Sequence, residues 1–215
     1  MLHFKTIYKK GTAEITEKKS RFIGSAFPVN TENQAIEYIA QVKKLHPKAN
    51  HNCFAYQIGQ NNEYIKQSDN GEPYGTAGMP ILDVLRKLEL RDTLIVVTRY
   101  FGGTLLGTGG LVRSYGLCAK QAATKGVIIE KMLYNKLSIK CNYSLSSKVQ
   151  YEILTNDYTL QNTIYTDIVE YIVFVPFVLT DKFIKNIINI CSNTATINIL
   201  NEAYAAFIDT EIIIF

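Results

Sequence analysis

Glycine is confined to the first part of this 215-residue chain: all 13 glycines lie at or before position 126, and none follows. Beyond that point Asn and Ile become dense instead. This change of composition predicts two domains, residues 1–134 and residues 135–215. Two domains also suit the chain length, because a typical domain has roughly 100 to 150 residues.

The composition is that of a globular protein. With 47% hydrophobic and 20% charged residues, the chain can bury a core, which excludes a disordered protein. No uncharged apolar run approaches the roughly 18 residues that span a bilayer. The start, Met1–Lys5, is not followed by the apolar core of a secretory signal peptide. We therefore expect a cytoplasmic protein with no membrane partner.

The cysteines are scattered. Cys53, Cys118, Cys141 and Cys191 stand singly, without the C-x-x-C pair that suggests zinc or a redox dithiol. The three histidines are not grouped either. We expect buried thiols, no metal site and no cofactor.

Charge is distributed unevenly along the chain. Residues 1–135 contain 18 Lys and Arg against 11 Asp and Glu, a net charge of +7, and residues 136–215 contain 5 against 8, a net charge of −3. If a polyanion binds, the first part is expected to bind it. A solvated surface with unevenly spread lysines explains the same numbers, and charge alone favours that interpretation.

Hydrophobic periodicity predicts mixed helices and strands in the first domain. Thr31 and Gln34 have capping-box spacing, and Leu94–Val97 is apolar throughout, as is typical of a central buried strand. The predicted elements are strands over 13–16 and 21–29, a helix over 31–46, strands over 51–58 and 63–67, a helix over 81–90, a strand over 93–101, a helix to about 125 and a strand over 127–133.

The second domain is predicted to have the element order βαββαβ, with a boundary near Tyr134–Asn135. Its predicted elements are a strand over 136–143, a helix over 145–156, strands over 159–166 and 171–178, a helix over 181–191 and strands from 196 onward. This order is that of the ferredoxin-like split βαβ unit.

A glycine-rich loop follows the central strand and leads into a helix. Its spacing fits neither a Walker A loop, which needs Lys-Ser/Thr after the second glycine, nor the dinucleotide fingerprint. Backbone N–H groups at Gly107, Gly109 and Gly110, together with the positive end of the helix, still predict an anion site.

Two arginines flank this loop. Arg99 ends the strand and Arg113 lies in the first turn of the helix, so together they could hold a phosphate. The alternative is a sharp turn in which the arginines pair with loop carboxylates, and spacing does not decide between the two. Tyr100 is a candidate for stacking on an unpaired base.

The segment Ser68–Gly78 has three glycines and one proline in eleven residues, which indicates a shaped loop. Its carboxylates Asp69 and Glu72, with His51 as a general base, are candidate catalytic residues. The alternative is that the carboxylates accept backbone N–H groups and His51 is a strand-end polar residue. The residue pattern favours this alternative.

Four ordered segments over about 95 residues resemble the IMPACT family in its bacterial, YigZ-like form. The segments are Lys19–Ile23, His51–Gly59, Ser68–Gly78 and Val97–Gly103 with the following Leu106–Arg113. The resemblance implies an N-terminal domain of the left-handed βαβ type, shared with a ribosomal protein and with domain IV of elongation factor G. It also implies a ferredoxin-like C-terminal domain.

The resemblance also bears on function. Eukaryotic members regulate translation initiation, largely through an additional N-terminal domain that we do not expect in this chain. Our first hypothesis is a non-enzymatic protein that associates with RNA or the ribosome, with a possible protein partner in translation control. The alternative is a hydrolase or phosphotransferase that uses His51, Asp69 and Glu72 beside the same anion site.

Overall fold

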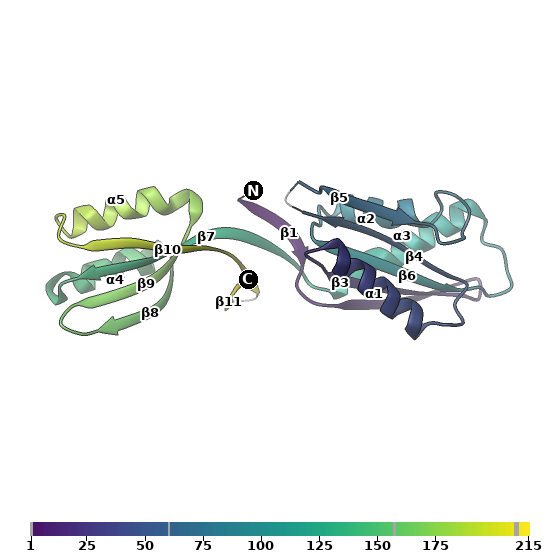
Figure 1. Ribbon diagram of the computed structural model, residues 1–215, viewed down its shortest axis with the longest axis horizontal. Coiled ribbons are helices and arrows are strands. Elements are labelled where there is room, and N and C mark those ends of the chain that lie inside the picture. Colours follow the sequence, from purple (N-terminus) through teal and green to yellow (C-terminus); the bar gives the residue numbers. More distant parts are fainter. Residues whose placement is uncertain (1, 60, 157, 209–210) are drawn as a thin grey trace. The chain divides into compact units, whose positions relative to one another are not determined.

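Figure 1 shows the protein as a computed structural model, which describes residues 2–59, 61–156, 158–208 and 211–215. The chain divides into two compact units. The first unit is residues 4–130, and the second unit is residues 131–215 with Leu2 and His3. Both combine helices with antiparallel sheets, so the predicted α+β class is confirmed.

The first unit is built on a five-stranded sheet of order β2-β3-β6-β4-β5, in which all neighbours are antiparallel. From the N-terminus the elements are β1 (His3–Ile7), β2 (Gly11–Glu17), β3 (Ser20–Pro28), α1 (Glu32–Leu45), β4 (His51–Ile58), β5 (Tyr64–Ser68), α2 (Gly78–Lys87), β6 (Thr93–Tyr100) and α3 (Gly107–Lys125).

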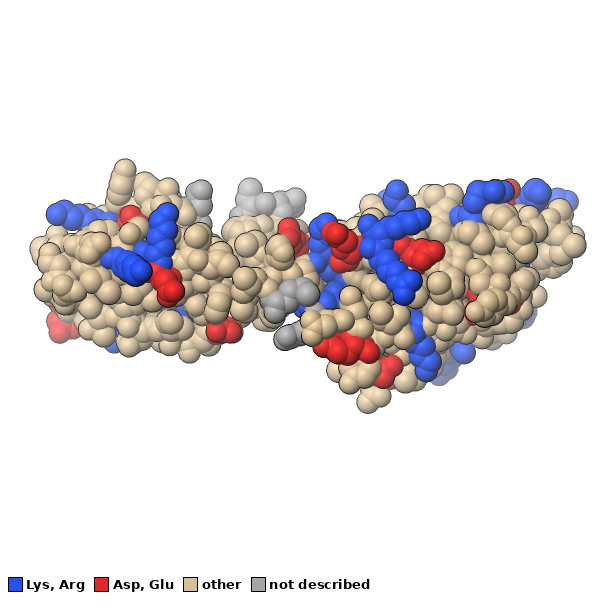
Figure 2. All heavy atoms as spheres, turned by 90° about the horizontal axis from the view of Figure 1, so that it is seen from above, with Lys and Arg blue, Asp and Glu red and all other residues tan. Residues whose placement is uncertain are grey.

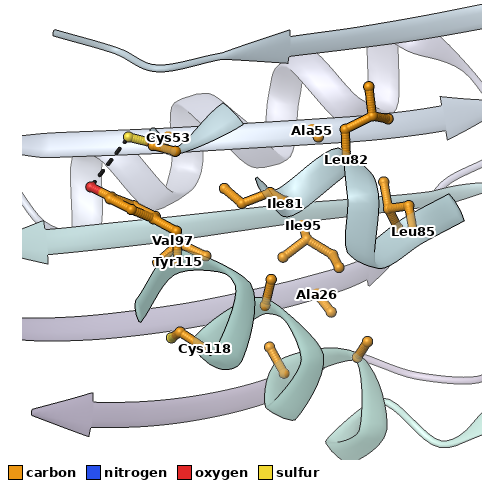
Figure 3. Close-up of a cluster of buried hydrophobic side chains, with 14 of the residues drawn as sticks. Ala26, Cys53, Ala55, Ile81, Leu82, Leu85, Ile95, Val97, Tyr115 and Cys118 are labelled. Carbon is orange, nitrogen blue, oxygen red and sulfur yellow. Dashed lines mark hydrogen bonds between the residues drawn. The ribbon is translucent and has the colours of Figure 1, made fainter. Parts of the chain in front are cut away.

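Helices cover both faces of this sheet. On β6, Ile95 and Val97 pack into the cluster beneath α2 and α3 (Figure 3), whereas Leu94 and Val96 pack into the cluster beneath α1. Alternate strand residues point to opposite faces, so an apolar run is needed where both faces are covered. The prediction of a central buried strand is confirmed.

Local sequence signals fix the ends of α1 and α2. The Thr31 side chain accepts a hydrogen bond from the Gln34 N–H, as the predicted cap requires. The helix predicted over 81–90 lies three residues earlier, because α2 begins at Gly78. Pro80 therefore lies within its first turn, where a missing N–H costs no intrahelical bond. It ends at Lys87 because Glu89 takes the left-handed conformation, with φ of 54°.

The turn between β2 and β3 is a two-residue loop. Lys18 and Lys19 have φ angles of 43° and 67°, as a type I′ turn requires, and Glu17 lies opposite Ser20 in the antiparallel register. The predicted hairpin is confirmed.

The second unit has a sheet of order β11-β10-β7-β9-β8. Buried residues of α4 and α5 pack against one face of this sheet. The elements are β7 (Ile128–Cys141), α4 (Tyr143–Thr155), β8 (Thr159–Tyr165), β9 (Val169–Pro176), a 3₁₀ turn η1 (Phe177–Leu179), α5 (Thr180–Ile190), β10 (Thr196–Ile208) and β11 (Glu211–Ile214).

The prediction of two strands around Tyr134–Asn135 was wrong. β7 runs without interruption through both residues, each of which is 5% exposed. Asn135 reads as a linker residue in the sequence, but its side-chain amide donates to Thr180 Oγ1 over 2.9 Å, which makes its burial tolerable. The division into domains 1–134 and 135–215 stays a prediction, and its boundary falls inside this strand.

Within the described part of the chain, none of the helices has both the length and the apolar character needed to cross a membrane.

Candidate functional site

The functional segments expected from the sequence meet at one end of the first unit's sheet. The antiparallel register places Arg21 opposite Tyr100 and His51 opposite Arg99, so the turn before β3, the start of β4 and the end of β6 coincide. Ser68, at the end of β5, lies opposite Phe54. We call residues 17–20, 46–51, 69–77 and 101–110 the loop end.

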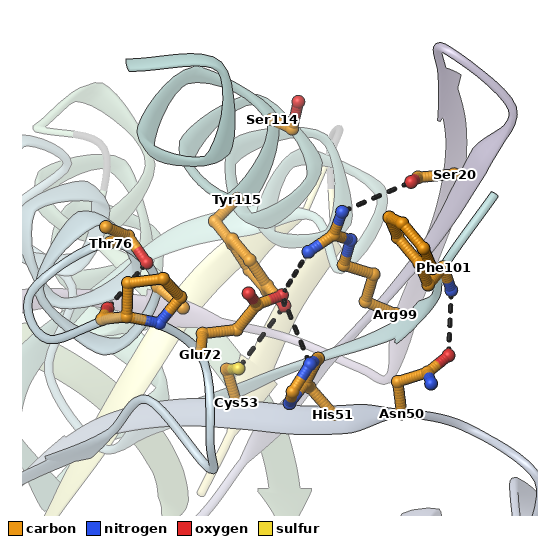
Figure 4. Close-up of polar contacts among 12 residues, drawn as sticks. Ser20, Asn50, His51, Cys53, Glu72, Thr76, Arg99, Phe101, Ser114 and Tyr115 are labelled. Atoms are coloured by element: carbon orange, nitrogen blue, oxygen red, sulfur yellow. Dashed lines mark hydrogen bonds and ion pairs between the residues drawn. The ribbon is translucent and has the colours of Figure 1, made fainter. Parts of the chain in front are cut away.

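A buried ion pair lies at the centre of the loop end (Figure 4). Arg99 Nη1 donates to Glu72 Oε1 over 2.7 Å, and the two side chains are only 6% and 3% exposed. The same Glu72 oxygen accepts the hydroxyl of Tyr115 over 2.7 Å. Further hydrogen bonds help to compensate a buried charge pair, although Arg99 Nε is buried without a hydrogen-bond partner among the described residues.

Arg99 is further held by its surroundings. Its Nη2 donates to Ser20 Oγ over 3.2 Å, and Ser20 Oγ also accepts the Gly102 N–H over 3.2 Å. The guanidinium carbon lies 5.4 Å and 5.5 Å from the ring centres of Phe22 and Phe101. These contacts join the β3 hairpin to the glycine-rich loop, so Arg99 acts as a structural link between the two segments.

A thiol and a phenol extend the network inward. Cys53 Sγ donates to the Asp69 carbonyl over 2.9 Å and lies 3.4 Å from Tyr115 Oη (Figure 3). Burial raises the pKa of the Cys53 thiol to about 12. Burial, with the neighbouring Cys53 and Glu72, also raises the pKa of Tyr115. Both groups therefore stay neutral hydrogen-bond donors.

Asp69 anchors the shaped loop onto α2. Its Oδ1 accepts the N–H groups of Ala77 and Gly78, and its Oδ2 accepts that of Gly75, all within 2.9 Å. Partial burial alone would raise the pKa of Asp69, but these three backbone donors lower it below its ordinary value. This contact pattern is the alternative that the sequence favoured for Asp69.

His51 touches the network from its more exposed side. Its Nδ1 lies 2.9 Å from the Asn70 carbonyl, which can only accept, so Nδ1 carries the proton. Its Nε2 faces Glu72 Oε1 at 3.9 Å, beyond hydrogen-bond distance. The loop end thus brings His51, Asp69 and Glu72 together, but each carboxylate is already occupied by protein donors.

Arg113 is placed differently from Arg99. It is exposed, makes no ion pair among the described residues, and its Nη1 lies 3.7 Å from where a Cβ of Gly109 would stand. The first turn of α3 has no side-chain cap and no acidic residue, and Gly107 is exposed with φ of 70°. Exposed amides and a guanidinium therefore lie together here.

The two arginines do not form the phosphate pair considered above. Arg99 is paired with Glu72, as the alternative interpretation allowed, and only Arg113 remains open to solvent.

Tyr100 points away from both arginines. Consecutive strand residues face opposite sides, and its hydroxyl lies 3.0 Å from His46 Nδ1, just after α1. Arg21 lies over its ring at 5.8 Å. Tyr100 is thus separated from the anion site with which the sequence grouped it.

Tyr115, Cys53 and Ser20 were missed as members of this network. The sequence does carry one signal. Tyr115 shares a helical face with the apolar Leu111, Cys118 and Ala122, which predicts its burial, and a buried phenol needs a partner. Its acceptor, Glu72, stands 43 residues away in the chain.

Charged side chains are mixed on the visible surface. In the part of Figure 2 that holds residues 4–130 (right), Lys and Arg are interspersed with Asp and Glu. Within the described residues, no group of three or more His, Cys, Asp or Glu is arranged to hold a metal ion.

Comparison with known proteins matches both parts of the chain. The Impact N-terminal domain matches residues 18–123, which include the whole loop end except residue 17, and a domain of unknown function (DUF1949) matches residues 139–194. IMPACT family member YvyE of Bacillus subtilis (strain 168) is 41% identical over 184 residues, 85% of this chain and 85% of that protein.

The chain belongs to the IMPACT family. IMPACT family member YigZ of Escherichia coli (strain K12) is 35% identical over 150 residues, 66% of this chain and 74% of that protein. A solved structure described as that of a hypothetical protein superposes with a TM-score of 0.60 at 28% identity, over 94% of this chain and 98% of the other. The IMPACT resemblance predicted from the four segments is confirmed.

Proposed function

We propose that this IMPACT family protein associates with RNA or the ribosome in translation control, and that the first unit contacts phosphate. The observation that carries the proposal is the exposed Arg113 guanidinium beside the uncapped, glycine-rich first turn of α3. Free N–H groups at the positive end of a helix attract anions, and a guanidinium adds a charged donor fork.

The charges around this turn support the proposal. Residues 4–130 contain 17 Lys and Arg against 11 Asp and Glu, a net charge of +6, and α3 contains no acidic residue. Lys18 is exposed, and together with Arg113 it lines a groove between the end of β2 and α3. Our proposal leaves out Arg99, which is buried, and Tyr100, which faces the other side of the sheet.

We also propose a finer fold type for each unit. In the second unit, β7, β8, β9 and β10 are the first to fourth strands of the βαββαβ pattern and have the spatial order 4-1-3-2, with the helices on one face. We assign it a ferredoxin-like fold on this basis. For the first unit we retain the left-handed βαβ type implied by the family resemblance.

The test is RNA binding as a function of salt, with a labelled oligouridylate and an RNA stem-loop as probes. Phosphate contacts predict an affinity that falls as salt rises, and Arg113→Ala should reduce the slope of log affinity against log salt by about one. Lys43→Ala is the matched control, because this exposed lysine lies in the last turn of α1, on the other face of the sheet.

Equal binding by wild type, Arg113→Ala and Lys43→Ala would refute the anion site. Asp69→Asn combined with Glu72→Gln should lower stability but keep RNA affinity within a few-fold, because neither carboxylate is proposed to touch RNA. Turnover of a phosphoester, peptide or nucleotide by wild type that disappears in a folded double variant would favour an enzyme instead.

A further inference from the structure

Among the residues that the structure describes, no strand lies beside the outer edge of β2. β2 ends the sheet order β2-β3-β6-β4-β5, and β3 is its neighbour on the inner side. Such an edge presents backbone donors and acceptors to any extended chain that can lie along it.

The turn fixes which backbone groups point outward. In a two-residue hairpin the flanking residues, here Glu17 and Ser20, exchange both of their hydrogen bonds, and bonded and unbonded pairs then alternate. The N–H and C=O groups of Thr12, Glu14 and Thr16 therefore face away from β3. No backbone hydrogen bond of the described residues occupies them.

A groove of about 290 Å³ lies beside this edge. One wall is the run of four consecutive residues Ile15–Lys18 at the end of β2. Ala13 and Ile15 face the core beneath α3, so Thr16 faces the opposite side. A groove lined by all four residues therefore runs along the backbone of the strand and reaches the free groups of Thr16.

The other wall is one face of α3. Its lining residues follow the helical spacing i, i+3, i+4 and i+7, and they are Gly110, Arg113, Ser114 and Leu117. Leu106, just before the helix, also lines the groove. A strand edge with a helix alongside is the arrangement in which an extended peptide adds to a sheet and inserts alternate side chains into the groove.

We propose that an extended, acidic peptide segment of a partner protein binds here by adding a strand to the outer edge of β2. Charge selects the acidic partner: the exposed Lys18 and Arg113 line the groove against one acidic residue, Glu17. Lys19 is exposed in the adjoining turn, and α3 has no acidic residue. The apolar side chains of Ile15, Leu106 and Leu117 would receive the alternate residues of the peptide.

This surface goes beyond the proposed RNA association. Arg113 belongs to both sites, so the acidic segment and RNA should exclude each other, and the peptide would regulate access to the phosphate site.

The test uses the full chain and a synthetic acetylated peptide of alternating Val and Glu, with binding measured by calorimetry. Two derivatives carry N-methyl groups on alternate residues, one on each backbone edge. Because one edge would pair with β2, one derivative should lose about 10-fold or more in affinity and the other should bind like the parent. A Val–Lys peptide should bind at least about 10-fold more weakly.

Thr16→Pro tests the protein side, because it removes an outward N–H at the groove, and proline is tolerated on edge strands. Thr16→Pro should lower the affinity for the Val–Glu peptide by about 10-fold. Lys43→Ala is the control, because this exposed lysine lies in α1 on the other face of the sheet, and it should leave binding unchanged. Should Thr16→Pro unfold, the two N-methylated peptides still decide.

Three results would overturn the proposal. The first is equal binding, or no binding, of all the peptides. The second is a concentration-dependent dimer whose formation Thr16→Pro abolishes, which would make a second copy the occupant. The third is loss of oligouridylate binding in Thr16→Pro without any peptide binding, which would assign the groove to RNA.

Discussion

The two units bury different kinds of polar groups. Among the described residues, buried charged side chains lie only in the first unit, at Glu72, Arg91 and Arg99. The buried polar residues of the second unit are the uncharged Asn135, Ser138 and Thr180. Burying a charge is costly unless partners compensate it, so the first unit depends on pairs such as that of Arg99 with Glu72 and the second on apolar packing.

The units also differ in how they turn. In the first unit five glycines take positive φ angles beside non-glycine residues such as Lys18 and Glu89, whereas in the described part of the second unit Ser192 and Asn193 do so after α5. Asn tolerates the left-handed conformation better than most side chains. The absence of glycine beyond residue 126 thus matches a unit whose turns use Asn and Ser.

The largest effect expected is from Glu72→Ala. It leaves the buried Arg99 without its carboxylate, which should lower the free energy of unfolding of the first unit by about 3–5 kcal/mol. Amide hydrogen exchange on the full chain would show lost protection in β4, β6 and α3, with the second unit unchanged.

Two variants serve as controls for this prediction. Glu170→Gln alters a partly buried carboxylate of the second unit, paired with Lys140, and should cost less than about 1 kcal/mol. Glu72→Leu with Arg99→Met should recover most of the stability lost by Glu72→Ala. A loss below about 1 kcal/mol for Glu72→Ala would mean that buried charge does not distinguish the units.

A smaller effect is expected from Gly102→Ala. A Cβ there would stand 2.0 Å from the Lys19 carbonyl carbon, so the loop would have to move, at a cost of about 1–3 kcal/mol in unfolding free energy. Gly116→Ala is the matched control, because this helical glycine has open space and should gain about 0.5–1 kcal/mol. Thermal melts that rank the two variants in the reverse order would contradict the close approach at Gly102.

The smallest effect is expected from Asp69→Asn, at about 1 kcal/mol near neutral pH, because only one of the two side-chain oxygens can still accept backbone N–H groups. The folded pKa of Asp69 lies below its ordinary 3.8. Its stabilisation is therefore complete above about pH 4 and is lost as the pH falls through the folded value.

Urea melts of wild type and Asp69→Asn at a series of pH values would measure this. The two curves should converge in acid, and a constant difference at every pH would show that the charge of Asp69 contributes nothing.

Local signals explain how much of the fold could be predicted. Thr31 with Gln34 and the run Leu94–Val97 act through neighbours in sequence, and both predictions held. The predicted break between two strands at Tyr134–Asn135 was wrong. Asn135 is buried because its side chain bonds to Thr180, which is 45 residues away in the sequence.

The site was predictable in part for the same reason. Spacing indicated that Asp69 or Glu72 could hold Arg99, but choosing between them requires knowing that α2 offers its first N–H groups to Asp69. The contribution of Tyr115 depends on packing of α3 across the sheet, which no local pattern encodes.

The buried cysteines have a consequence for measuring how each unit opens. Burial raises the pKa of Cys53 and Cys118 to about 12, and it also raises the pKa of Cys141 and Cys191. Alkylating reagents attack the thiolate, so labelling at neutral pH waits for a local opening that exposes the sulfur. Each unit holds two such thiols, so the rate of alkylation in each unit would report how often that unit opens.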